Sequence, residues 1–218
     1  MPLVLHKNIE NGVIGLWKIS EEVIDLEYLA RLSAQDLITY NSITALHRKK
    51  EWLVTRALLN LLINEPTQIN YSNEGQPFLE NGKCNISISH TTGFVAVMLH
   101  EIFIPGIDIE LTSRQVSRVA GRFLSAEEFE ACTEYSGFSN RKLLLHWCAK
   151  EAIFKMVPFT NVEFSTDIQI SLNDTVHKTG VFQGMFINHS SSMPITLEYL
   201  EEDGVILVWG IPDGFFSP

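Results

Sequence analysis

Cysteine is scarce in this chain, and its three cysteines are widely spaced. Cys84, Cys132 and Cys148 form no Cys-x-x-Cys pair, and an odd number cannot all be joined in internal disulfides. The sequence therefore supports neither a disulfide framework nor a cysteine-rich zinc site. Reduced thiols are normal in the cytoplasm, so we expect a cytoplasmic protein.

Long apolar runs are also missing. No stretch approaches the roughly 18 consecutive apolar residues that a membrane-spanning helix needs. The first residues, MPLVLHKNIENG, contain no basic stretch followed by a long hydrophobic one. We therefore expect a soluble, uncleaved protein with no membrane partner.

Positive charge is in deficit. The chain has 16 Lys and Arg residues against 26 Asp and Glu, which gives a formal net charge of −10 at pH 7. Such a charge repels nucleic acids and anionic membranes at long range, so we expect no nucleic-acid partner. Any anionic ligand must be held by a local basic cluster.

The remaining composition, 45% hydrophobic and 19% charged residues, is that of an ordinary globular protein. A chain of 218 residues fits one larger domain or two packed halves of roughly 100 residues each. Each half mixes helical and mainly antiparallel strand patterns, which predicts an α+β fold.

Periodicity and turn signals predict the individual elements. In the first half they predict a strand at 13–19, a helix opening at Ser20, a helix from about Arg48 to Ile63, and a hairpin of 85–90 with 94–99. In the second half they predict a strand after Pro105, a mostly helical region at 114–156 with a capping box at Ser125 and Glu128, and strands within 164–172, 180–187, 194–200 and 204–211. One face of the 48–63 helix is apolar, and Lys49 and Arg56 lie on its other side, where we expect positive charge to be presented.

The segment Gly106-Ile107-Asp108-Ile109-Glu110 places two acids on one face of a strand. Two carboxylates that converge in this way suit Mg²⁺, which takes one or two carboxylates and completes its shell with water and phosphate oxygens. The same pattern also fits a solvated strand face that carries two acids by chance.

Two further segments carry candidate functional residues. In WCAKEAIFK, Glu151 and Lys155 share one helix face, where the glutamate can ligate metal or accept a proton and the lysine can meet a phosphate. Such a pair is also common on helix surfaces. In SISHT, Ser89 and His90 end a strand and can bind phosphate oxygens, although a histidine there also fits an ordinary turn or core residue.

The order of these three segments resembles the surfactin-type branch of the 4'-phosphopantetheinyl transferase family. That family is similar in having an ISHS-type element, then a GxDxE strand, then a WxxKExxxK helix, and this chain has SISHT, GIDIE and WCAKEAIFK. RKKEWLVTR, NEGQPFL and RFLSAEE also resemble family segments, so the resemblance extends from about Arg48 to Lys155.

The resemblance implies a pseudo-twofold pair of α+β half-domains, 1–104 and 105–218, with the active site in the cleft between them. It implies Mg²⁺ on Asp108, Glu110 and Glu151, with Glu151 and Lys155 as catalytic residues. The residues it implies for coenzyme A binding are Arg48, Lys49, Arg56, Ser89, His90, Lys150 and Lys155.

The activity implied is transfer of the phosphopantetheine arm of coenzyme A to a serine of an apo acyl carrier protein, or of a peptidyl or polyketide carrier domain. Either Glu151 or a metal-bound water takes the serine proton, and 3',5'-ADP leaves. With both half-domains in one chain, a monomer is the simpler expectation.

Two positions depart from the family pattern, and two other functions stay open. Gln76 replaces a frequent lysine, and Glu51 lies where a basic residue is common, so both remove positive charge from the expected nucleotide site. These changes favour a catalytically silent module that binds coenzyme A or a carrier protein. Paired carboxylates also occur in metal-dependent phosphodiesterases and nucleases, but the acidic composition argues against nucleic acid.

Overall fold

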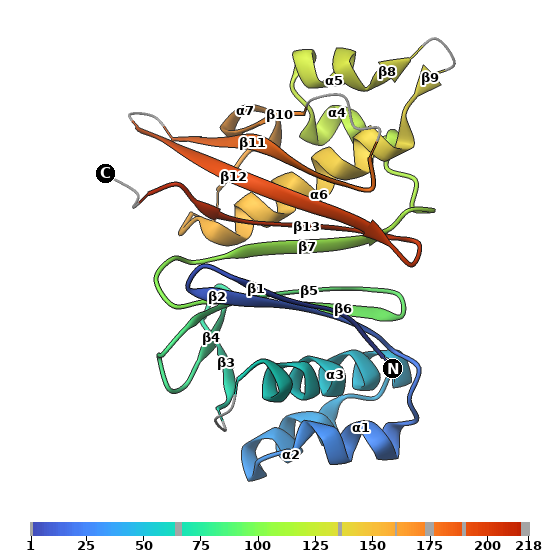
Figure 1. Cartoon of the computed structure of the whole chain (residues 1–218), viewed down its shortest axis with the longest axis vertical. Coiled ribbons are helices and arrows are strands. Elements are labelled where there is room, and N and C mark those ends of the chain that lie inside the picture. The colour runs from blue at the N-terminus through green and yellow to red at the C-terminus, as the bar shows by residue number, and fades with distance from the viewer. Residues whose placement is uncertain are drawn as a thin grey trace. The chain divides into compact units, whose positions relative to one another are not determined.

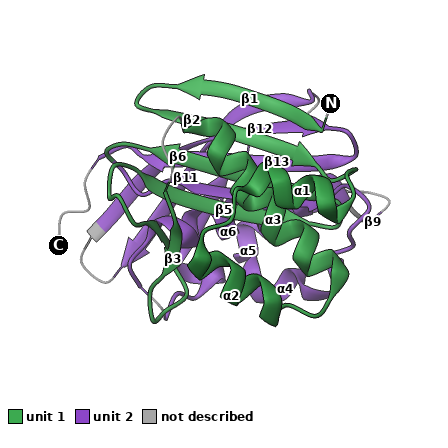
Figure 2. Ribbon diagram, turned by 90° about the horizontal axis from the view of Figure 1, so that it is seen from below, with its two compact units in different colours: residues 1–102 green, residues 103–218 purple. Residues whose placement is uncertain are grey.

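The chain forms two compact units, residues 1–102 and 103–218, which Figure 2 shows in green and purple. The computed structural model describes residues 2–63, 67–134, 137–159, 161–172, 177–188 and 191–214. Each unit combines helices with an antiparallel sheet and has its own apolar core, which confirms the predicted α+β class. The pseudo-twofold relation between the halves stays a prediction.

Unit 1 is an antiparallel sheet with its helices on one face (Figure 1). Its strands, in spatial order, are β1 (Leu3–Ile9), β2 (Gly12–Lys18), β6 (Phe94–His100) and β5 (Asn85–Thr91). Its helices are α1 (Val23–Ala30), α2 (Ala34–Ser42) and α3 (Leu46–Leu62), and a small hairpin pairs β3 (Ile69–Tyr71) with β4 (Pro77–Leu79). The apolar face of α3, including the fully buried Leu53, Val54 and Leu58, belongs to the core shared with the sheet.

Most of the predicted elements in this unit are confirmed, including the hairpin β5–β6 and the amphipathic helix α3. The helix opening at Ser20 is corrected, because α1 begins at Val23 and has no side-chain cap. The helical stretch then breaks at Arg31, which adopts the left-handed conformation with φ of 49°. Ser33 caps a separate helix, α2, in a capping box with Asp36.

Unit 2 is a second antiparallel sheet with the long helix α6 packed against it (Figure 1). Its strands, in spatial order, are β10 (Ile168–Ser171), β11 (Thr179–Asn188), β12 (Ser191–Glu202), β13 (Val205–Pro212) and β7 (Gly106–Leu111). Its helical elements are η1 (Ser117–Val119), α4 (Ala120–Phe123), α5 (Ala126–Cys132), α6 (Asn140–Met156) and α7 (Phe164–Asp167). Two short strands, β8 (Thr133–Glu134) and β9 (Gly137–Phe138), pair between α5 and α6.

The capping box of Ser125 and Glu128 at the start of α5 is confirmed, and so is the end of α6 before Pro158. The strand predicted from residue 164 is wrong over its first four residues, which form α7. A carboxylate oxygen of Asp167 accepts a bond from the Glu163 N–H, and the Asp167 N–H donates to the Glu163 carbonyl, so the two residues close a helical turn. Among the described residues, no helix has the length and apolar character needed to cross a membrane.

Candidate active site

The glycine of the GIDIE segment allows β7 and α6 to touch. A side chain on Gly106 would overlap the carbonyl oxygen of Ala152 in α6, so only glycine permits this approach of the two backbones. Side chains alternate along a strand, and Asp108 and Glu110 therefore share the face of Gly106. The contact at Gly106 thus turns both acids toward α6.

Asp108 and Glu110 are buried on this face, with exposed fractions of 6% and 8%. The alternative interpretation of this segment, a solvated strand face, is therefore wrong, because α6 packs against that face. Ile107 and Ile109 are buried on the opposite face of β7, as alternation predicts. Two carboxylates buried in this way need polar partners.

Lys155 of α6 is one of these partners. Its ammonium nitrogen Nζ lies 2.8 Å from Oδ1 of Asp108 and 2.8 Å from the carbonyl oxygen of Ile107. Cys148, about two turns before Lys155 on α6, also bonds to Asp108, and its thiol pKa is raised well above 9.0, first by burial and then by the Asp108 charge. Asp108 is therefore fixed to α6 at two points.

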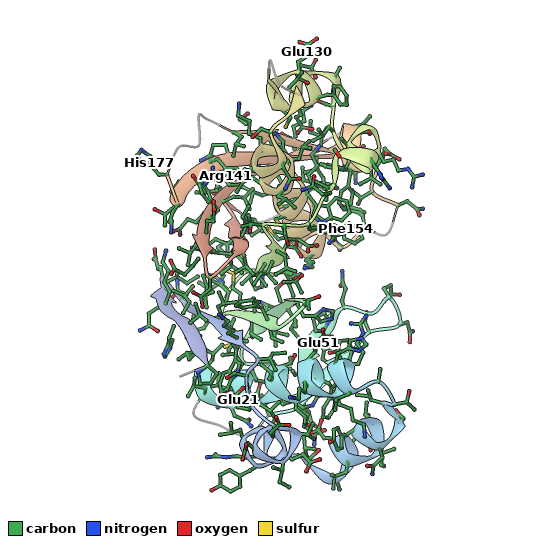
Figure 3. The ribbon with its side chains drawn as sticks, turned by 90° about the vertical axis from the view of Figure 1, so that its right-hand side faces the viewer. Glu21, Glu51, Glu130, Arg141, Phe154 and His177 are labelled. Atoms are coloured by element: carbon green, nitrogen blue, oxygen red, sulfur yellow. The ribbon has the colours of Figure 1, made fainter. Side chains whose placement is uncertain are left out.

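Glu151 belongs to the same cluster. Burial and then the nearby charge of Asp108 raise the pKa of Glu151 above 4.5, while the charges of Lys155 and Arg114 oppose the shift. The three carboxylates predicted from the sequence therefore lie within electrostatic reach on one strand and one helix. Figure 3 marks this helix with Arg141 near its start and Phe154 near its end.

Arg114 is a member of the cluster that the sequence did not single out. It follows β7, and its guanidinium pairs with the carboxylate of Glu110 and lies 5.3 Å from the ring centre of Trp147. Arg114 follows Glu110 by four residues, a spacing that brings two side chains together on a helix. In the turn that follows a strand, the same spacing does not predict that Arg114 contacts Glu110. The structure therefore adds a second cation to the site.

In the part of the chain that the structure describes, no three or more His, Cys, Asp or Glu side chains are gathered to hold a metal ion. Asp108 and Glu110 each hold a side-chain cation instead, Lys155 and Arg114 respectively. The arrangement has three carboxylates against two cations, so it keeps an excess of negative charge when all are ionised.

Lys150 has a different place from the one that the resemblance implies. Its side chain is completely buried, and its ammonium nitrogen lies 2.6 Å from Glu128 and 2.7 and 2.6 Å from the carbonyl oxygens of Phe164 and Ile168. The expectation of a phosphate contact is therefore corrected to a structural role, since the ammonium faces the core and already has three oxygen partners.

The candidate phosphate-binding residues of unit 1 form a separate group on α3 and β5. Glu51, labelled in Figure 3, accepts a bond of 3.2 Å from Arg48, and its Oε2 lies 4.0 Å from Nδ1 of His90. Arg48 also lies 3.2 Å from Nε2 of His90. Ser89, next to His90, is buried. The carboxylate that departs from the family pattern therefore lies directly beside two of the residues that the resemblance implies for coenzyme A binding.

Lys49 and Arg56, predicted on the charged side of α3, differ in their surroundings. Lys49 is half-buried, and its ammonium lies 4.7 Å from the ring centre of Tyr40. Arg56 is buried, with its Nε 2.8 Å from Asp36 and its guanidinium 3.2 Å from the ring centre of Trp52. The expectation that Arg56 presents its charge outward is corrected, because α2 brings Asp36 against it.

The fold and the site together define an α+β protein whose charged cluster of carboxylates, lysine and arginine is held by one strand and one helix. Residues 105–205 match the family model of the 4'-phosphopantetheinyl transferase superfamily, and this region contains both GIDIE and WCAKEAIFK. No curated protein sequence matches the chain. This match over 105–205 supports the resemblance that the motifs predict, and phosphopantetheinyl transfer is the general activity that it supports.

Proposed function

We propose that this protein is a Mg²⁺-dependent enzyme that transfers the phosphopantetheine arm of coenzyme A to a serine of an apo carrier protein, releasing 3',5'-ADP. The observation that carries the proposal is the contact of β7 with α6, which brings Asp108, Glu110, Glu151 and Lys155 together within the region that matches the superfamily. The acceptor is an acyl carrier protein, or a peptidyl or polyketide carrier domain.

The carboxylates of this cluster are of the chemical type that suits a magnesium ion. Carboxylate oxygens are the ligands that Mg²⁺ prefers, and Asp108 and Glu151 lie close enough for one charge to raise the pKa of the other group. A divalent cation relieves the repulsion between the Asp108 and Glu151 carboxylates. Asp108, Glu110 and Glu151 would hold the ion, which supplies neutralisation of the charge on the pyrophosphate of coenzyme A.

The protein's own residues would then orient the donor and take up a proton. In the transfer, the serine oxygen bonds to the β-phosphorus, the bridging P–O bond breaks, and 3',5'-ADP takes the electron pair. Lys155, with 26% of its side chain exposed, is accessible to a phosphate oxygen beside Asp108. A neutral serine needs a base, and the proton passes either to Glu151 or to water.

In unit 1, Arg48, Lys49, Ser89 and His90 are the proposed contacts of the coenzyme A phosphates. Arg48 and His90 have 56% and 43% of their side chains exposed, so both are accessible to an anion. Glu51 offsets part of the Arg48 charge. This arrangement supports a binding role for these residues and a weaker hold on the nucleotide than a basic residue at position 51 would give.

The alternative, a silent module that binds coenzyme A or a carrier protein, rests on the charge changes at Glu51 and Gln76. A group of three carboxylates, two of them buried, disfavours it, because keeping such charges together is costly and a module that only binds has no use for them. Catalysis with a metal gives the three acids a function.

The direct test is intact-mass spectrometry of apo carrier proteins incubated with the protein, coenzyme A and Mg²⁺. Transfer adds about 340 Da, the mass of the group that coenzyme A carries. We expect this gain with Mg²⁺ and its absence when the metal is chelated. Coenzyme A binding without a gain on any of several carriers would instead establish the silent module.

Asp108→Asn tests the site within the same assay. The variant keeps the size of the side chain but loses its charge, so we expect transfer to fall by at least roughly 100-fold while thermal unfolding changes little. Glu10→Gln, which removes an exposed acid between β1 and β2, is the charge-matched control and should behave as wild type. Metal-dependent turnover at the wild-type rate in Asp108→Asn would remove Asp108 from the site.

A further inference from the structure

Arg114 is anchored by the two elements that carry the candidate active site. Its N–H donates to the carbonyl of Leu111, the last residue of β7, over 3.0 Å. Its own carbonyl accepts a bond of 3.1 Å from the side-chain amide of Asn140, the first residue of α6. The backbone of Arg114 is therefore positioned by the same strand and helix that position the carboxylates.

The side chain of Arg114 has one buried and one solvent-facing side. Its guanidinium pairs with Glu110, whose side chain is 10% exposed, while the Arg114 side chain itself is 46% exposed. The ring centre of Trp147 lies 5.3 Å from the guanidinium carbon, which is within the range of a cation–π contact. Arg114 also acts on Glu151, since its charge opposes the rise in pKa that burial and Asp108 cause.

If a divalent cation binds to the cluster, either Lys155 or Arg114 has to leave its carboxylate, and the contacts of the two side chains indicate which one. Three carboxylates face Lys155 and Arg114, and a bound divalent cation would turn this negative excess into a positive one. Lys155 is held by both Asp108 and the Ile107 carbonyl and is the less exposed of the two cations. Arg114 holds one carboxylate and is half exposed, so it is the cation that can leave its carboxylate most easily.

An arginine that leaves Glu110 still has its anchored backbone and the face of Trp147. Its planar guanidinium presents paired N–H donors that match two oxygens of a phosphate, which a lysine does not offer. We propose that Arg114 is a further substrate-binding residue of this enzyme: it holds Glu110 in the metal-free protein, releases it when a divalent cation binds, and then contacts a phosphate of the donor. This inference rests on the proposed transferase function.

Two substitutions separate the charge of Arg114 from its shape. Arg114→Gln removes the charge that competes with the metal, and Arg114→Lys keeps the charge without the paired donors. Arg122→Gln, at an exposed position on α4, is the matched control for the loss of one positive charge. The probe is Mn²⁺ binding to the metal-free protein without coenzyme A, followed by electron paramagnetic resonance, with KM for coenzyme A measured in parallel.

We expect Arg114→Gln to bind Mn²⁺ roughly tenfold more tightly than wild type, because an adjacent opposite charge shifts carboxylate equilibria by about one to three tenfold steps. Its KM for coenzyme A should rise roughly tenfold, as expected for the loss of a charge-assisted contact. Arg114→Lys should bind Mn²⁺ like wild type but keep the raised KM. Arg122→Gln should leave both quantities unchanged.

The failures of this inference and of the proposed function are distinguishable. If wild type transfers the phosphopantetheine arm and Arg114→Gln has the Mn²⁺ affinity and KM of wild type, only the role of Arg114 is overturned. A changed Mn²⁺ affinity with an unchanged KM overturns the phosphate contact. A wild-type protein that neither binds Mn²⁺ nor transfers overturns both proposals.

Discussion

Lys150 and Lys155 lie five residues apart on α6, and both are paired with an acid, yet their surroundings are opposite. Lys150 is fully buried and holds Glu128 and two carbonyl oxygens. Lys155 holds Asp108 and one carbonyl oxygen but keeps a quarter of its side chain exposed. With about 100° between successive helical residues, a spacing of five turns the two lysines to different sides of the helix.

The comparison shows that an ion pair alone does not identify a functional residue. The buried pair joins α6 to α5 and to β10, since Glu128 also accepts a bond of 2.8 Å from the N–H of Ile170. The pair of Lys155 and Asp108 joins α6 to β7, and Lys155 still has a surface that a ligand can reach. Burial therefore separates the lysine that supports the site from the lysine that can take part in it.

The largest predicted effect is on stability, from Lys150→Met. Removing the lysine leaves the Glu128 charge buried without its ammonium partner, and breaking such a pair lowers the free energy of unfolding by about 3–5 kcal/mol. Urea denaturation followed by circular dichroism measures the loss. Adding Glu128→Gln to Lys150→Met should recover part of it, because the amide oxygen still accepts from Ile170 without carrying a charge. If Lys150→Met is as stable as wild type, Lys150 is not the structural lysine.

Lys155→Ala should affect the rate more than the stability. We expect kcat to fall roughly 100-fold, equivalent to about 2.7 kcal/mol, with a smaller loss of coenzyme A binding. Steady-state transfer and calorimetric titration with coenzyme A provide the two quantities. Lys142→Ala, the same substitution elsewhere on α6, should retain the wild-type rate. Unchanged kinetics in Lys155→Ala would exclude Lys155 from the site.

The sequence predicts what depends on local patterns. Alternation and turn signals predict the hairpin β5–β6, and the order of the motifs predicts the family. The sequence also contains a pattern that predicts the burial of Lys150, but the position of Lys150 next to Glu151 favours a role in the site instead. Leu143, His146, Lys150 and Ile153 recur at helical spacing on one stripe, and all four are buried.

The contacts that give these residues their roles join distant positions, and no local pattern encodes them. Arg56 meets Asp36 across two helices, over 20 positions of the sequence. Glu128 and Lys150 meet only because α5 packs on α6. Arg114 reaches Trp147 because the turn after β7 passes the helix. Such pairings follow from the packing of whole elements, so the candidate residues are predictable from the sequence but their partners are not.

The smallest predicted effect concerns pH and again the buried side of α6. Burial lowers the pKa of His146 below 6.5, although the Lys142 carbonyl and the Glu128 charge oppose the shift. Below pH 6.5 His146 therefore binds a proton in the unfolded chain but stays neutral in the folded chain. The free energy of unfolding decreases as the pH falls from 6.5 toward the lowered pKa. We expect this histidine to contribute a loss of about 1 kcal/mol per pH unit in that range. His146→Leu removes the group, so urea unfolding of the variant over the same pH range should show a shallower slope. Equal slopes would mean that His146 is protonated alike in the folded and unfolded states, and the buried side of α6 would then be more open to water than its packing indicates.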